Sequence, residues 1–238
     1  EKPYTILPPG NLEKLLACAD GNAVVHFIDS AVPPEELKNV LPVLKTMTGG
    51  FYGFARPESS LLEPDLMARL KRSGCLMLQT GVESGSPGIL KRFRKGFLPS
   101  TAERVIEESH LNGIANYIYL LFGLPGETDM DRNLTLELVR KHADAIDFMN
   151  ISVFNLPERS ELTERADEFD IEPGEYDADS RVLRFYRPFT ETSGGNPRIQ
   201  ARRYLNDVFK QDDDVARILQ QTPRWFRAAH MALMKPSY

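Results

Sequence analysis

Two glycine-rich segments carry the residue types best suited to chemistry. Residues 81–86 read Gly-Val-Glu-Ser-Gly-Ser, and residues 123–128 read Gly-Leu-Pro-Gly-Glu-Thr. Each segment follows an apolar run and opens into a helix pattern, so each is predicted to be a loop at the carboxyl end of a strand, where α/β folds bind ligands. A carboxylate and a hydroxyl in the first segment suit polar ligand groups, and the glycines of the second let a ligand or a helix approach the backbone closely.

The elements that must position these loops alternate along the chain. The apolar runs predict five strands, over residues 23–28, 51–55, 75–80, 115–122 and 146–154. Amphipathic patterns predict helices over 34–45, 64–72, 87–93 and 101–112, and a further helix capped by Thr128 that carries Met130, Leu134 and Leu138. Strands recurring about every 25–40 residues are typical of βαβ units, so we predict an α/β fold with parallel strands and right-handed crossovers.

Beyond residue 156 the pattern changes, and we predict a division into a domain of residues 1–156 and an extension of residues 157–238. Charge, proline and glycine rise over 157–197, with an extended piece over 181–189. Helices are predicted over 198–210 and 212–234. The acidic run 212–214 is interpreted as a helix cap rather than a metal site, because carboxylates suit the positive end of a helix dipole.

Composition narrows the classes of function. The chain has 238 residues, 42% of them hydrophobic, which is enough for a sizeable core. A net charge of -5 and the lack of a basic run argue against a nucleic-acid partner. The apolar stretches are far shorter than a membrane span needs, and the first residues lack a signal-peptide pattern, which favours the cytoplasm. Cys18 and Cys75 are too far apart for a zinc knuckle or a redox pair and are interpreted as small buried hydrophobes.

In the order of its segments, the chain from Ala23 to Leu156 resembles the radical S-adenosylmethionine (SAM) superfamily, in particular the branch that often carries a cobalamin-binding domain upstream. The matching segments are the strand tips 27–30 and 54–56, the stretch 81–96 and the loop 123–128. Where many members have a Pro-Gly-Thr turn after the sixth strand, this chain has Leu-Pro-Glu-Arg-Ser at 156–160.

The resemblance implies a partial (β/α)6 TIM-like barrel of which this chain supplies five of six β/α units. The first strand and the CxxxCxxC cluster loop of the family would lie upstream of Glu1, which lacks an initiator methionine and begins a proline-punctuated lead, so we expect a fragment. It also implies roles in SAM binding: Asp29 would accept from the ammonium, Glu83 with Ser84 from the ribose hydroxyls, and backbone at Gly123 and Gly126 would approach adenine. Arg56, Arg94 or Lys95 would meet the ligand carboxylate.

The function implied is that of a radical SAM Fe-S oxidoreductase or methyltransferase-like enzyme. In the full-length protein a [4Fe-4S] cluster, bound by three upstream cysteines, would cleave SAM reductively, with an electron donor such as flavodoxin or ferredoxin. The substrate is unknown, an upstream domain of the same protein is the expected partner, and cobalamin is a possible cofactor of that protein. These residues alone are expected to be catalytically silent, since they lack the thiolates that hold the cluster.

Two other hypotheses stay open at this stage. The chain could be a cluster-free α/β-barrel enzyme that binds an anionic small molecule at the Gly123 loop, where a helix N-terminus favours negative charge. It could also be a non-enzymatic scaffold whose helices over 198–234 dock another domain, which a large exposed apolar face would indicate.

Overall fold

The computed structural model describes residues 22–28, 49–175 and 185–223, together with residues 11, 14, 16, 38, 41, 42 and 44. The predicted site residue Asp29, most of the predicted helix over 34–45 and the end of the predicted helix over 212–234 lie outside the described residues.

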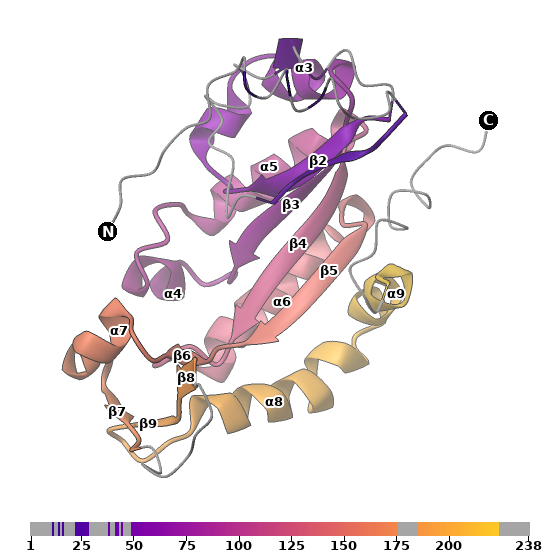
Figure 1. Cartoon of the computed structure of the whole chain (residues 1–238). Coiled ribbons are helices and arrows are strands. Elements are labelled where there is room, and N and C mark those ends of the chain that lie inside the picture. The colour runs from indigo at the N-terminus through magenta and orange to yellow at the C-terminus, as the bar shows by residue number, and fades with distance from the viewer. Residues whose placement is uncertain are drawn as a thin grey trace.

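Five parallel strands form one sheet in the order in which they occur along the chain (Figure 1). They are β1 (Val25–Phe27), β2 (Phe51–Ala55), β3 (Cys75–Glu83), β4 (Ala115–Phe122) and β5 (Phe148–Val153). This order is what successive β/α steps produce, and it confirms the predicted α/β class with a parallel sheet. All five carboxyl ends therefore lie at one edge of the sheet.

Helices cover one face of this sheet, which we call the outer face (Figure 1). They are α3 (Leu66–Arg72), α5 (Pro99–Leu111) and α6 (Asp129–Lys141), and the short α4 (Pro87–Arg92) precedes α5. The opposite, inner face carries Tyr52, Met77 and Tyr117, which pack together. Short 3-10 turns lie at η1 (Ser59–Leu62), η2 (Ala143–Ala145), η3 (Ala166–Phe169) and η4 (Phe209–Gln211).

The start of α6 is set by a capping box. The Thr128 side chain accepts from the Asp131 N–H, and the Asp131 side chain accepts from the Thr128 N–H, as the Thr128 cap predicted. Of the apolar residues predicted on this helix, Leu138 is buried but Met130 is 75% exposed, and Leu136, Val139 and even Arg132 are buried as well. The reason lies in the ionic partners of Arg132, described below.

The segment after β5 builds two small antiparallel ladders and two helices. β6 (Leu156–Pro157) pairs with β8 (Tyr186–Arg187), and β7 (Ile171–Pro173) pairs with β9 (Phe189–Glu191). Between β6 and β7 lies α7 (Glu161–Glu164). After β9 the chain continues through α8 (Pro197–Asp207) and α9 (Asp213–Gln221). Asp212 caps α9 by accepting from the Val215 N–H, as predicted. The helix ends at Gln221, earlier than predicted, because Thr222 takes the extended conformation that a following proline favours.

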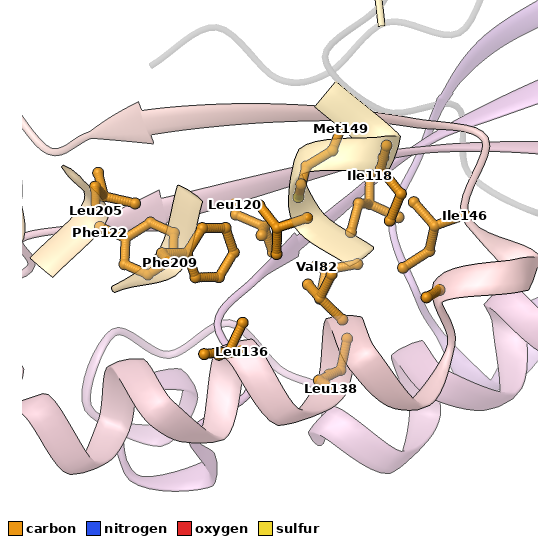
Figure 2. Close-up of a cluster of buried hydrophobic side chains, with 14 of the residues drawn as sticks. Val82, Ile118, Leu120, Phe122, Leu136, Leu138, Ile146, Met149, Leu205 and Phe209 are labelled. Atoms are coloured by element: carbon orange, nitrogen blue, oxygen red, sulfur yellow. The ribbon is translucent and has the colours of Figure 1, made fainter. Parts of the chain in front are cut away.

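This segment completes the core of the sheet instead of standing apart from it (Figure 2). Ile118, Leu120 and Phe122 of β4 share one buried cluster with α6 and with Leu205, Phe209 and Ile218 from the C-terminal helices. The predicted boundary at residue 157 therefore crosses a continuous hydrophobic core. No helix in the described parts of the chain is long and apolar enough to cross a bilayer.

Candidate functional site

A bulge at the end of β3 sets the position of Glu83. The register against β4 shifts between Gly81 and Glu83, and Glu83 has a φ of 65°. A bulge of this kind leaves one residue unpaired and re-aims its side chain. A non-glycine residue in the left-handed region is uncommon and costs conformational energy. The strand therefore ends in a carboxylate held at the carboxyl edge of the sheet.

A cleft at this edge brings four of the predicted site residues together. Its volume is about 480 Å³, and its charged lining residues are Arg56, Glu83, Arg94 and Lys95. Lys95 Nζ lies 3.3 Å from Glu83 Oε1, and an Arg56 Nη2 N–H donates to the Lys95 carbonyl. A Cβ on Gly81 would meet only the Glu83 carboxylate, at 3.3 Å, so the glycine leaves the floor of the cleft bare.

Arg94 points its guanidinium out of this group. Its Nη1 lies 2.8 Å from Glu161 Oε1 on α7, and its side chain is 62% exposed. The cleft therefore holds one cation close to Glu83, a second cation tied to the 94–96 turn, and a third engaged at the rim.

Ser84 lies outside the cleft and supports the loop. Its side chain is fully buried, and its Oγ accepts from the Ser86 N–H at 3.1 Å and lies 3.3 Å from Thr135 Oγ1. Gly85 N–H donates to the same Thr135 hydroxyl at 2.9 Å. The backbone of Gly85 passes so near α6 that a Cβ there would lie 2.4 Å from the Leu134 carbonyl oxygen. This packing against α6 fixes the bulge that aims Glu83.

The second glycine loop is satisfied by carboxylates of the chain itself. The Gly123 N–H donates to Glu127 Oε2 at 2.6 Å, and the Gly126 N–H donates to Glu191 Oε1 at 2.7 Å. Gly126 lines another cavity, of about 970 Å³, and a Cβ on Gly123 would meet Ala201 of α8 at 3.2 Å. Neither of these two N–H groups is left to bind an anion.

Glu127 has the most strongly shifted pKa among the described carboxyl groups at this edge of the sheet. Its side chain is fully buried and its Oε2 lies 3.0 Å from Arg132 Nε, while Arg132 also donates to the Glu127 carbonyl and to Asp129. Burial raises the pKa of Glu127 to about 7, against the Gly123 N–H and Arg132, which lower it. Both functional and structural groups show such shifts. The bond from the Gly123 N–H identifies Glu127 as a residue that orders the loop.

Sequence reasoning missed the polar and aromatic side chains of the inner face. Tyr117, Tyr119 and His26 line a cavity of about 770 Å³ on the inner face, with Phe54 beside them, although Tyr117 is buried. The signal in the sequence is the spacing of two between Tyr117 and Tyr119, which places both side chains on one face of a strand.

An iron-sulfur cluster does not fit the described residues. Cys75 is buried on the outer face of the sheet, among residues of α3 and β2, and burial raises the pKa of its thiol to about 12. Cys18, the other cysteine of the sequence, lies outside the described residues. No group of three or more His, Cys, Asp or Glu side chains that could hold a metal ion occurs in the part of the chain that the structure describes.

Comparison with known proteins gives one family match and several structural ones. A family model described as the radical SAM superfamily matches residues 34–139. Coproporphyrinogen III oxidase (HemN) from Escherichia coli, a radical SAM enzyme, is 15% identical with a TM-score of 0.49, over 77% of this chain and 40% of that chain. The radical SAM methyltransferase TsrM from Kitasatospora setae, solved with cobalamin and a [4Fe-4S] cluster, is 18% identical with a TM-score of 0.48, over 62% and 28%.

Elp3 from the archaeon Methanocaldococcus infernus is 17% identical with a TM-score of 0.46, over 67% of this chain and 43% of that chain. The chain thus spans less than half the length of each of these proteins. No curated protein sequence matches.

Proposed function

Residues 34–139 of this chain belong to the radical SAM superfamily, and from this premise we propose that the chain is the core of a radical SAM enzyme whose cleft at Glu83 binds SAM. The observation that carries the proposal is the convergence of Arg56, Glu83 and Lys95 at the carboxyl edge of the parallel sheet, within the matched segment. The sheet would be part of a (β/α)6 barrel to which this chain contributes five strands.

The chemistry of the cleft suits the parts of SAM. The ligand carries a carboxylate, an ammonium group, a ribose diol and a flat adenine. The Glu83 carboxylate can accept from the ribose hydroxyls, and the Arg56 and Lys95 cations can bind the carboxylate through charge-assisted hydrogen bonds. Phe54 and Tyr119, which also line the cleft, offer ring faces to the adenine. We propose that Asp29 accepts a hydrogen bond from the ammonium group of SAM. The absence of a side chain at Gly81 leaves room for the ligand in the cleft.

The other predicted site residues receive supporting roles in this proposal. Ser84 ties the end of β3 to α6, and Gly123 and Gly126 shape the loop that Glu127 orders. Arg94 closes the rim of the cleft against α7.

Bound beside a reduced [4Fe-4S] cluster, SAM supplies radical chemistry that protein side chains cannot supply. Since these residues do not fit the cluster, its three thiolates are proposed to come from a segment upstream of Glu1 in the full-length protein, and a flavodoxin or ferredoxin is proposed as electron donor. The contribution of the described residues is to orient SAM at the edge of the sheet and, through the inner-face aromatic side chains, to exclude water from the reacting end.

SAM binding to this chain tests the proposal directly. We expect saturable binding by isothermal titration calorimetry, and we expect Glu83→Gln to weaken it about tenfold or more, because a hydrogen bond to a charged group contributes about 1.5–3 kcal/mol. The matched control is Glu107→Gln, which replaces an exposed carboxylate of α5 on the outer face of the sheet. It should change the Kd for SAM less than about twofold. Equal SAM affinity of the wild type and Glu83→Gln would contradict the assignment.

Reconstitution with iron and sulfide tests the fit of the cluster separately. We expect no stoichiometric cluster absorbance and no SAM cleavage from this chain, because it has two cysteines in all and the thiol of Cys75 is buried. Electron paramagnetic resonance of the reduced sample should be silent as well. A stable cluster that cleaves SAM on these residues alone would overturn the upstream-ligand proposal.

A further inference from the structure

The inner-face cavity lies next to the proposed SAM cleft. The two share Phe54 and Tyr119, so a ligand in the cavity would touch the same rings as SAM. The cavity measures about 770 Å³, which is the size range of small-molecule sites. Its floor is the sheet, and its far wall is α8, which runs along the β5 edge (Figure 1).

The floor of the cavity is aromatic and rigidly arranged. The ring of Tyr119 lies 4.9 Å from that of Tyr117 and 5.4 Å from that of Phe54, centroid to centroid. The buried Gln79 amide joins two of the floor residues: its Nε2 donates to Tyr119 Oη at 2.9 Å, and its Oε1 lies 3.0 Å from His26 Nε2. Rings fixed in this way present ready faces for stacking a planar ligand.

The wall opposite this floor is cationic. Arg202 and Asn206 lie four residues apart on α8 and therefore share one side of the helix. Lys210 of η4, which follows α8, lines the same wall, and its Nζ donates to Asn206 Oδ1 at 3.3 Å. Arg198, one turn earlier on α8, has a buried Nε without a hydrogen-bond partner among the described residues, and burial together with the charge of Arg202 lowers its pKa. Among the described residues that line the cavity there is no carboxylate to offset these charges.

The cavity at Gly126 differs from the inner-face cavity, because its lining contains both cations and carboxylates. There the cations Arg132 and Arg203 face Asp129, Asp170 and Asp207 across the same space. Arg203, the sequence neighbour of Arg202, lies 3.5 Å from Asp207, whereas Arg202 makes no hydrogen bond or ion pair within the described part of the chain. Arg203 thus has a carboxylate beside it, whereas Arg202 is available to an anion.

We propose that this cavity binds the substrate, and that the substrate is a planar aromatic compound carrying an anionic group, with its ring on the part of the floor formed by Tyr117 and Tyr119 and its anion at Arg202 and Lys210. The identification of this ligand as the substrate rests on the proposed radical SAM function. The binding itself does not. The C-terminal helices would then supply the specificity of the enzyme, while the sheet supplies the cofactor cleft.

Probe binding tests the inference. We expect 2-naphthoate to bind with a Kd at least about tenfold lower than that of its neutral amide, and about tenfold lower than that of cyclohexanecarboxylate, which keeps the charge and lacks the aromatic ring. Arg202→Gln should weaken 2-naphthoate at least about fivefold and leave the amide unchanged. The matched control is Arg203→Gln, which should leave both unchanged. The same titrations with 2-naphthyl phosphate show whether a carboxylate or a phosphate is preferred. Tighter binding of either acid than of the amide supports the proposal.

Two results would overturn it: equal affinity for 2-naphthoate and its amide, or equal effects of the Arg202 and Arg203 variants. Circular dichroism of both variants checks that α8 stays folded. SAM titration in parallel separates the two proposals. Normal SAM binding that depends on Glu83, combined with probe binding indifferent to Arg202, would defeat only the substrate inference. Probe binding that depends on Arg202 in a chain that does not bind SAM would defeat only the proposed function.

Discussion

Replacing Arg132 with Met is expected to lower the free energy of unfolding by about 3–5 kcal/mol at about pH 8, because it removes one partner of a buried ion pair. The Arg132 side chain is 2% exposed and the Glu127 side chain 0%, with 3.0 Å between Nε and Oε2. Methionine fills much of the space of arginine but carries no charge. The Glu127 carboxylate then keeps the Gly123 N–H as its donor within the described residues. Urea denaturation followed by circular dichroism measures the change.

The effect should depend on pH in a defined direction. The pKa of Glu127 in the folded state, about 7, lies above its ordinary value of 4.5. A raised carboxyl pKa means that the folded state favours the protonated form, so stability is fully present below the ordinary pKa and falls as pH rises towards about 7. Removing Arg132 raises this pKa further and extends the loss to higher pH. The variant should therefore be closer to the wild type at about pH 6 than at about pH 8, and an equal difference at both would contradict this account.

Two further variants isolate the buried pair. Arg140, on the same helix, lies 2.6 Å from Asp212 but is 53% exposed, so Arg140→Met should cost at most about 1 kcal/mol. Adding Glu127→Gln to Arg132→Met removes the stranded carboxylate, and we expect the double variant to recover much of the lost stability. The resulting coupling energy is the interaction itself.

Replacing Gly85 with Ala is expected to destabilise the fold by about 3 kcal/mol or more, a large effect for one methyl group. The added Cβ would lie 2.4 Å from the Leu134 carbonyl oxygen and 2.7 Å from Thr135 Cα. Both are backbone atoms of α6 and cannot rotate away. The loop must therefore leave the helix, which breaks the bonds of Gly85 and Ser84 to Thr135 and frees the bulge at Glu83. Thermal and urea unfolding measure the loss, and SAM affinity should fall with it.

Gly88→Ala provides the matched control, three residues further on. A Cβ there would meet only Ser86 Oγ, at 3.5 Å, within the helix α4. Alanine in a helix is favoured over glycine by about 0.5–1 kcal/mol, so this variant should be as stable as the wild type or slightly more stable. If the two alanine variants unfolded at the same urea concentration, the close approach of the loop to α6 would not limit stability.

Strands whose ends are marked by glycine residues could be predicted well from the sequence. β2 and β4 match the apolar runs that Gly50, Gly113 and Gly123 delimit, each with a positive φ. β3 extends past the predicted end through Gly81 and Glu83, because pairing with β4 holds a stretch that is neither apolar nor alternating. α9 stops early because of Pro223, a local signal that the apolar pattern beyond it obscured.

The candidate site divides in the same way. Arg56 and Glu83 meet in one cleft because parallel strands end at one edge, and the order of the strands in the sequence suffices to predict this. Lys95 joins them from the turn after α4. The burial of Ser84 and the occupation of Gly126 could not be predicted, because their partners, Thr135 and Glu191, are brought near by tertiary packing alone. The cationic wall of the inner-face cavity could not be predicted from the sequence for the same reason.

The core shared between β4 and the C-terminal helices also has a consequence for synthesis of the chain. Ile118, Leu120 and Phe122 are buried in one cluster with Val215 and Ile218, which are translated much later. With about 100 residues between them and elongation at about 5–20 residues per second, the apolar outer face of β4 stays partly uncovered on the ribosome for roughly 5–20 s. During that interval the nascent sheet is a natural client for a chaperone that binds apolar strands, and a chain truncated before α9 would keep this face uncovered and be prone to aggregation.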